Sequence, residues 1–339
     1  MTRMIRNMKY RMIDLFAGIG GIRIAFEENG AKCVKSSEID KYACDTYEKN
    51  FHEMPLGDIT KIKPEDLTDF DIITAGFPCQ PFSLGGLRKG FEDTRGTLFF
   101  EVARLIKAKK PKAFFLENVE GIVNHDSGKT ISVIENVLHD LDYNFQWRVM
   151  NASDYGTPQN RKRWYCVGFR KDLDIGFEGQ EGKFKVIYNF PSKCVLKFKV
   201  KDVIEANVSD SYSVSETCER NINTYVEKFK EGPRYDSTNV LIANEIRPSR
   251  CNFRSDGISP CLTAKMGTGG NNVPVYVEKM RKLTERECLR LMGFPDWYQI
   301  EPNTMHSYKQ IGNSVVVTII SELAKEMIRV MKVIDQEVK

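Results

Sequence analysis

Short apolar runs alternate with segments of helical periodicity over the first half of the chain. The runs predict strands at residues 12–17, 33–39, 71–76, 112–118, 145–151 and 164–169. The segments between them predict helices at residues 21–29, 41–51, around 98–106 and around 130–141. Strands that alternate with helices are typical of an α/β fold: a doubly wound, mostly parallel sheet with helices on both faces. Ligands of such sheets bind at the carboxyl ends of the strands.

The pattern changes near residue 185, and helical periodicity is poor from there to about residue 275. Lysines are interleaved with apolar residues (KFKVIYNF, VLKFKVKD), which predicts a smaller, irregular strand-and-loop domain. Thr284 is placed to cap a helix, and residues 313–333 predict a long amphipathic helix that returns to the first domain. We therefore divide the chain into a first domain (1–185 with 310–339), a second domain (186–275) and a connector (276–309).

Composition places the chain among ordinary folded proteins. It has 339 residues, of which 41% are hydrophobic and 28% charged, and its net charge of +4 permits a nucleic-acid partner without requiring one. No apolar run approaches the roughly 18 to 20 residues of a membrane span, and the N-terminus lacks a signal-peptide core. We expect a cytoplasmic protein.

The nine cysteines are scattered and form no C-x-x-C pair, and there are only four histidines. We therefore expect no disulfide framework, no zinc site and no catalytic metal.

A glycine-rich turn, DLFAGIGG, follows the first predicted strand. Arg23 stands where the dinucleotide motif G-x-G-x-x-G would have its third glycine, which weakens a pyrophosphate-binding interpretation. Glu38 ends the second strand, where a carboxylate can accept hydrogen bonds from ribose hydroxyls. A nucleoside without a pyrophosphate, such as S-adenosylmethionine, suits both facts, and Asp58 would then face the adenine amino group. A plain strand-to-helix turn with an exposed glutamate is the alternative.

The segment AGFPCQPFS carries Cys79 directly after the third predicted strand. Pro78 and Pro81 would stiffen this turn and hold the sulfur at the carboxyl edge of the sheet. A nucleophilic cysteine needs access and a polar setting that favours the thiolate. A cysteine that merely packs after an apolar strand is the alternative.

Two further segments bring polar groups to the same edge. In KAFFLENV, Glu117 ends an apolar strand, where poor solvation should raise its pKa and let it hold a proton near neutral pH. In TPQNRKRW, the alternation of Arg161 and Arg163 places both arginines on one face of a strand. A capping or salt-bridging glutamate and an exposed basic edge are the alternatives.

These groups together suit the methylation of cytosine at carbon 5. A thiolate adds to carbon 6 while N3 is protonated, which makes carbon 5 nucleophilic towards a methyl sulfonium. Loss of the carbon 5 proton and expulsion of the cysteine then restore the ring.

The chain closely resembles the cytosine-5 DNA methyltransferases, in particular the small bacterial enzymes of restriction–modification systems. The resemblance covers nearly the whole chain in motif order: DLFAGIGG, SSEID, GDIT, AGFPCQPFS, RGTLFF, ENV, PQNRKRW, RKLTERECLRLMGFP and KQIGNSV. It implies a Rossmann-like, S-adenosylmethionine-dependent fold with Cys79 as the attacking thiolate and Glu117 holding N3 and the exocyclic amine. Arg163 would reach the base carbonyl, with Arg161 as its supporting partner.

The resemblance also implies a cofactor pocket for S-adenosylmethionine, with S-adenosylhomocysteine as the product. The matching positions are Phe16, Gly18, Gly20, Glu38, Ile39, Asp58, Ile59, Pro78, Leu98 and Asn313. Several relatives carry an aromatic residue against the adenine where this chain has Ile39. An aliphatic contact there should still work.

The partner implied by the resemblance is double-stranded DNA, whose target base must be flipped out to reach Cys79. Residues 81–96 resemble the loop that closes over DNA. Candidate DNA contacts are Gln80, Ser83, Arg95, Arg247, Arg250, Arg254 and Thr263. For the three arginines of the second domain, which have no acid between them, a solvated basic loop is the alternative.

Other functions stay open at this point. A tRNA cytosine-5 methyltransferase would carry the same motifs, a nicotinamide-dependent oxidoreductase would bind NAD, and a non-catalytic relative would bind DNA without methyl transfer. We expect a monomer, no membrane association, and compatibility with a cognate restriction endonuclease that acts on the same site without a stable complex.

Overall fold

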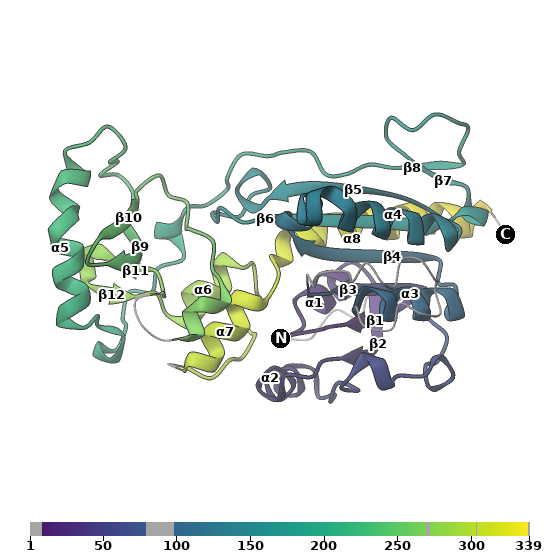
Figure 1. Ribbon diagram of the computed structural model, residues 1–339, viewed down its shortest axis with the longest axis horizontal. Coiled ribbons are helices and arrows are strands. Elements are labelled where there is room, and N and C mark those ends of the chain that lie inside the picture. The colour runs from purple at the N-terminus through teal and green to yellow at the C-terminus, as the bar shows by residue number, and fades with distance from the viewer. Residues whose placement is uncertain (1–8, 79–97, 269–271, 303, 338–339) are drawn as a thin grey trace.

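A six-stranded sheet forms the centre of the larger part of the molecule (Figure 1). The computed structural model describes residues 9–78, 98–268, 272–302 and 304–337. The strands of this sheet are β1 (Tyr10–Leu15), β2 (Ala31–Ser37), β3 (Ile72–Gly76), β4 (Ala113–Val119), β5 (Tyr143–Asn151) and β6 (Lys162–Arg170). Their order is β2-β1-β3-β4-β6-β5; neighbours are parallel from β2 to β4, whereas β6 runs antiparallel to both β4 and β5. The mostly parallel α/β sheet expected from the sequence is confirmed.

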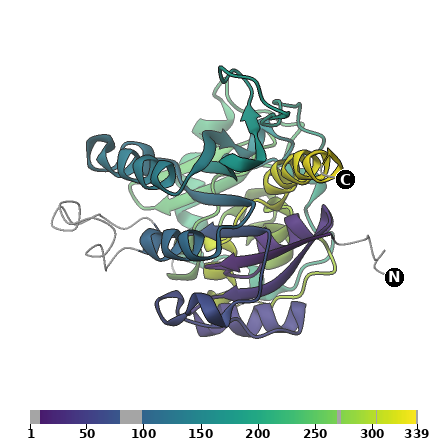
Figure 2. The same ribbon diagram turned by 90° about the vertical axis from the view of Figure 1, so that its right-hand side faces the viewer.

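Helices cover both faces of this sheet because successive strand residues point to opposite faces. Met12 packs with α1, α2 and α8 on one face, and its neighbour Ile13 packs with α3 and α4 on the other. The five helices are α1 (Gly21–Glu28), α2 (Lys41–Phe51), α3 (Leu98–Lys109), α4 (Lys129–Asp140) and α8 (Val317–Glu337). Figure 2 shows the blue α3 and α4 and the yellow α8 on opposite sides of the strands. The C-terminal helix thus returns to the first core, as the apolar stripe predicts.

The smaller part of the molecule is built on a four-stranded antiparallel sheet of order β10-β9-β11-β12. Its strands are β9 (Ile242–Arg247), β10 (Arg250–Arg254), β11 (Val275–Tyr276) and β12 (Arg281–Lys282). A helix that the sequence pattern did not predict, α5 (Glu216–Lys230), packs on this sheet. Ser215 caps it, and its buried face is narrow: Cys218, Asn221, Ile222 and Val226. The surrounding charged residues hid this short stripe from periodicity analysis.

The connection between the two parts contains the two-stranded parallel sheet β7 (Ile175–Phe177) and β8 (Val186–Tyr188), then α6 (Glu285–Leu291) and α7 (Met305–Asn313). Thr284 caps α6 through a capping box with Glu287, as expected. The prediction that the long helix starts at residue 313 is wrong. α7 ends at Asn313, Ser314 is extended, and α8 begins only at Val317. None of the described helices is long and apolar enough to cross a membrane.

Candidate active site

A cavity of about 410 Å³ opens at the carboxyl ends of β1 to β4. Of the predicted cofactor positions, it is lined by Phe16, Gly18, Glu38, Ile39, Asp58, Ile59, Pro78, Leu98 and Asn313. Glu117, Arg161 and Arg163 line the same cavity. The fold therefore joins the two groups of residues, which lie far apart in the sequence, in one continuous space.

The glycine-rich turn after β1 is held by a carboxylate from the next strand. Gly18 has φ +52°, and its backbone N–H donates to Glu38 Oε2 at 2.8 Å. Gly20 has φ +82°, and a Cβ there would lie 2.2 Å from a ring carbon of Phe51. Gly20 does not line the cavity, contrary to expectation; its lack of a side chain lets α2 pack against the turn.

Glu38 is already hydrogen-bonded to the backbone around the cavity. Besides Gly18, the N–H groups of Ile39 and Asp40 donate to its Oε1, each at 2.8 Å. A carboxylate offers about four acceptor sites, so capacity remains for a ligand hydroxyl. Beside it, the side chain of Ile39 is 72% exposed, an unusual value for isoleucine, at the rim of the cavity.

Asp58 also lines the cavity. Its Oδ1 accepts from the backbone N–H and the hydroxyl of Thr60 at 2.9 and 2.8 Å, and Oδ2 makes no hydrogen bond to the described residues. These hydrogen bonds, the backbone one first, lower the pKa of Asp58 below its ordinary value. The group therefore remains an acceptor suited to an amino group.

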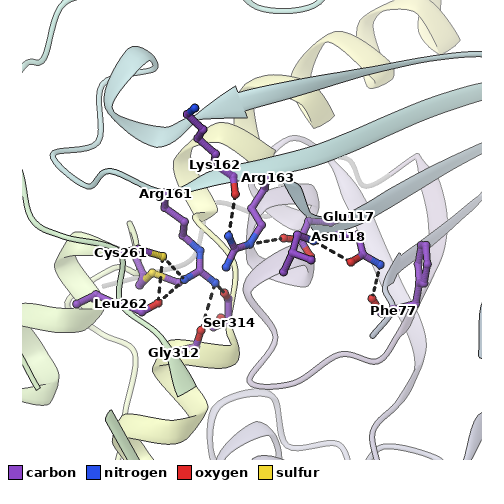
Figure 3. Close-up of polar contacts among 12 residues, drawn as sticks. Phe77, Glu117, Asn118, Arg161, Lys162, Arg163, Cys261, Leu262, Gly312 and Ser314 are labelled. Carbon is purple, nitrogen blue, oxygen red and sulfur yellow. Dashed lines mark hydrogen bonds and ion pairs between the residues drawn. The ribbon is translucent and has the colours of Figure 1, made fainter. Parts of the chain in front are cut away.

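Glu117 lies at the end of β4, where only 8% of the residue is exposed. Its Oε1 is 3.3 Å from Nε of Arg163, which comes from the antiparallel neighbour β6 (Figure 3). Burial raises the pKa of Glu117, and the charges of Arg163 and Arg161 oppose this rise without cancelling it. The raised pKa expected from the sequence agrees with this geometry.

Asn118, to which sequence reasoning gave no role, ties this strand end to the chain that leads into Cys79. Its Nδ2 donates to the carbonyl oxygen of Phe77 at 2.8 Å, and its Oδ1 accepts from the N–H of Val119 (Figure 3). The sequence signal for this role is an asparagine at the end of an apolar strand. Its side-chain amide can both donate and accept a hydrogen bond, and so can bind two backbone groups at once. Cys79 itself, Gln80, Ser83, Arg95 and the predicted closing loop 81–96 lie outside the described residues.

Arg161 lines the cavity, but its guanidinium is turned towards backbone carbonyls. It donates to the carbonyl oxygens of Leu262, Gly312 and Ser314 (Figure 3). Burial and the nearby charge of Arg163 lower the pKa of Arg161. Arg163 thus acts on Arg161 through its charge. The hydrogen bonds of Arg161 link its own segment to residues around 262 and 312–314.

Comparison with known proteins decides the family. The family model of the C-5 cytosine-specific DNA methylase matches residues 10–329. The chain belongs to this family. It is 42% identical over 319 residues to the type II methyltransferase M.HhaI of Haemophilus parahaemolyticus, covering 93% of each chain. It is also 42% identical over 320 residues to the type II methyltransferase M.HaeII of Haemophilus aegyptius, covering 94% of this chain and 93% of the relative.

Solved structures support the same fold. A DNMT2 variant of Spodoptera frugiperda superposes with a TM-score of 0.69 at 22% identity, covering 96% of this chain and all of that one. The methyltransferase EhMeth of Entamoeba histolytica superposes with a TM-score of 0.66 at 20% identity, covering 98% and 99%. The predicted family is confirmed, and the chain is a cytosine-C5 DNA methyltransferase rather than an oxidoreductase or a tRNA-specific relative.

The three arginines of the methylase's smaller sheet are not an unopposed basic patch. Arg250 pairs with Glu245 at 3.0 Å and Arg254 with Asp256 at 2.5 Å, so acids that flank the run in sequence neutralise it in space. Arg247 donates to Asn272 Oδ1 at 2.8 Å. Thr263 is exposed and directly follows the buried Leu262. Of these four candidates, Arg247 and Thr263 have no opposing acid among the described residues.

Proposed function

We propose that this methylase transfers the methyl group of S-adenosylmethionine to carbon 5 of a flipped-out cytosine in a short double-stranded DNA sequence, through a covalent bond between Cys79 and carbon 6. The observation that carries the proposal is the single cavity that joins the predicted cofactor positions with Glu117 and Arg163. A methyl donor and a base held at the two ends of one cavity can react directly.

The residues around the cavity fit S-adenosylmethionine. Glu38 retains acceptor capacity for ribose hydroxyls, and Asp58 Oδ2 suits the adenine amino group. Ile39 offers an exposed apolar surface against which an adenine ring would pack. When bound, S-adenosylmethionine supplies an electrophilic methyl group. The carboxylate acceptors Glu38 and Asp58 and the apolar contact Ile39 thus match the ribose, amino group and ring of its nucleoside part.

Named residues then carry the addition to carbon 6 and the protonation of N3. The Cys79 thiolate forms a bond to carbon 6, and the buried Glu117 carboxyl group, whose pKa burial raises, gives N3 a proton. Arg163 reaches the base carbonyl and orients Glu117. Carbon 5 would then take the methyl group that bound S-adenosylmethionine supplies, and a base such as water would remove the carbon 5 proton. The electrons of that bond expel the thiolate, and N3 returns its proton to the Glu117 carboxylate, which regenerates the neutral aromatic ring of 5-methylcytosine.

Sequence choice would fall to the smaller part of the molecule. We propose residues 186–275 as the target recognition domain, 276–309 as the connector, and 1–185 with 310–339 as the catalytic domain. Protection of host DNA against a cognate endonuclease, a monomeric state and a cytoplasmic location complete the proposal. The type II methyltransferases named among the relatives support this role.

The test is bisulfite sequencing of DNA from a methylation-deficient host that expresses the wild-type protein, Cys79→Ser or Glu117→Gln. The wild type should methylate one cytosine within one short motif. Cys79→Ser should reduce this at least about 1,000-fold and Glu117→Gln about 100-fold or more, because each removes a group that acts in the transition state. Cys194→Ser, which changes an exposed cysteine, is the matched control and should methylate like the wild type.

Absence of methylation from a soluble wild-type protein would overturn the proposal. Transfer RNA and cofactor binding would then be assayed with the same variants. Full activity of Cys79→Ser would leave the DNA substrate in place but exclude the covalent route.

A further inference from the structure

The active-site segment 158–161 and the segment 259–263 of the smaller part run side by side. Gln159 and Ser259 form a parallel bridge, in which the Asn160 N–H donates to the Ser259 carbonyl and the Ser259 N–H to the Pro158 carbonyl, at 2.9 and 2.8 Å. These bonds join a chain that begins β6 of the large sheet to a chain that leads into the predicted recognition residues. Backbone hydrogen bonds therefore connect the two parts of the molecule directly beside the active site.

The side chains of Gln159 and Arg161 hold the backbone of Leu262 from both sides. Gln159 Oε1 accepts from the Leu262 N–H at 3.1 Å, and the Arg161 guanidinium donates to the Leu262 carbonyl oxygen. Both side chains are buried: Gln159 is 0% exposed and Arg161 2%. Because both backbone polar groups of Leu262 are satisfied this way, its exposed neighbour Thr263 cannot shift without breaking buried hydrogen bonds.

The same guanidinium holds the end of α7. It donates to the carbonyl oxygen of Gly312 at 3.2 Å and to that of Ser314. Gly312 lies directly against the Thr263 backbone, since a Cβ there would be 2.1 Å from the Thr263 carbonyl carbon. Gly267, in η9 (Ala264–Thr268), lies equally close to α7: a Cβ there would be 2.4 Å from Cβ of Lys309. The segment 262–268 and α7 therefore meet backbone to backbone, and Arg161 joins them.

We propose that Arg161 is a positioning residue that sets sequence discrimination: it fixes Thr263 and η9 relative to the cavity that receives the target cytosine. This inference rests on the proposed function. It assigns Arg161 a task separate from that of Arg163, whose guanidinium contacts Glu117. A lysine cannot replace it, because an ammonium group is a point donor and does not span carbonyls from two segments as the planar guanidinium does.

The experiment compares wild type, Arg161→Lys and Gly267→Ala, with Arg170→Lys as the matched control. Arg170 is on the same strand, β6, but donates to the carbonyl of Lys110 and to Asp172, away from the cavity. The measured quantity is kcat/KM on the duplex motif found by bisulfite sequencing, divided by kcat/KM on duplexes with one base pair changed.

We expect this ratio to fall about tenfold or more in Arg161→Lys, the size of one lost charged hydrogen bond. Gly267→Ala should lower it in the same direction by forcing η9 away from α7, and Arg170→Lys should leave it unchanged. A purely structural or purely chemical role for Arg161 would slow methylation of all duplexes by one factor and keep the ratio, which would overturn the proposal.

Hydrogen exchange of residues 261–268 gives a readout that does not depend on methylation. Faster exchange of these residues in Arg161→Lys, with unchanged exchange in α3, supports the proposal that Arg161 fixes this segment. Unchanged exchange of residues 261–268 overturns it. A wild type that methylates no DNA would contradict the proposed function. The exchange data would still test separately whether Arg161 fixes residues 261–268.

Discussion

Two buried carboxyl groups show how individual residues of this methylase depend on partners that the sequence does not reveal. Glu117 was predicted from its place after an apolar strand, and burial does raise its pKa. Asp14, in β1, is 0% exposed and was not singled out, because a strand residue before a glycine turn carries no sign of its burial. Its pKa is raised to about 7, mainly by burial, with hydrogen bonding from Thr74 opposing the rise.

The contacts of Asp14 favour its neutral form. The Thr74 hydroxyl lies 2.7 Å from Asp14 Oδ1 and 3.2 Å from the Ile13 carbonyl oxygen, but one hydroxyl hydrogen serves only one acceptor at a time. Asp14 Oδ2 is buried and has no hydrogen-bond partner among the described residues. A protonated Asp14 can donate to Thr74 while Thr74 donates to Ile13.

This geometry predicts a stability that falls with pH. The folded pKa of Asp14 is about 7 and the ordinary value 3.8, so between these values the folded state binds a proton that the unfolded state has lost. The contribution of Asp14 is complete below about pH 4 and is lost as pH rises to about 7. Asp14→Asn removes this dependence, so the Tm of the variant minus that of wild type should increase from pH 5 to pH 8 in scanning fluorimetry.

The control for this prediction is Asp69→Asn, because the side chain of Asp69 is 97% exposed. Its Tm difference from wild type should change little over the same pH range. A constant difference for Asp14→Asn would show that Asp14 does not carry the extra proton.

At the scale of elements, the strands, their order of appearance and the turns at their ends followed from sequence, and short amphipathic elements did not. The apolar runs before the glycine turn, before Cys79 and at Glu117 are strong signals because buried parallel strands are apolar on both faces. α5 was missed because its apolar face is narrow, and the break between α7 and α8 was missed because the Ser314 region remains apolar in pattern. The tertiary contacts of Arg161 with Gly312 and Ser314, which no local pattern encodes, accompany this break.

The turns at the two ends of α1 give a matched pair of glycine substitutions. Gly20 and Gly30 both have positive φ, +82° and +100°, but a Cβ at Gly30 would meet nothing within 4 Å whereas one at Gly20 would strike Phe51. Gly30→Ala should therefore cost about 1–2 kcal/mol of unfolding free energy from backbone strain alone. Gly20→Ala should cost about 1–3 kcal/mol more from overpacking.

Urea unfolding of both variants measures the difference. Equal costs would mean that Phe51 moves aside freely, and that the packing of α2 on the turn is not what requires glycine at position 20.

At the scale of the whole molecule, a buried ion pair joins the smaller sheet to α6. Arg281 of β12 and Glu287 of α6 form two hydrogen bonds, at 2.9 and 2.7 Å, and Glu287 is 0% exposed. Glu287 also accepts from the N–H groups of Glu205 and Thr284. Three chain segments thus meet on one carboxylate. The approximate change of character near residue 185 was visible in the sequence, but this junction was not, because Glu205 and Glu287 are 82 residues apart.

Removing this carboxylate should destabilise the protein strongly. Glu287→Gln leaves the Arg281 charge buried without its counter-ion, which should cost about 3–5 kcal/mol. Asp296→Asn, which breaks the exposed pair between Arg290 and Asp296 nearby, should cost less than about 1 kcal/mol. Chemical denaturation of both variants gives the comparison, and similar costs would mean that water reaches Glu287.

The return of α8 to the first core has a consequence for how the protein is made. Asn29 at the end of α1 donates to the backbone and hydroxyl oxygens of Ser321 in α8, across 292 positions of sequence. A ribosome must therefore translate the whole segment that contains the smaller sheet before α8 can cover its face of the large sheet. A nascent chain interrupted earlier leaves that apolar face uncovered. A chain that stops before the smaller sheet is finished therefore also lacks the helix that completes the core of the large sheet.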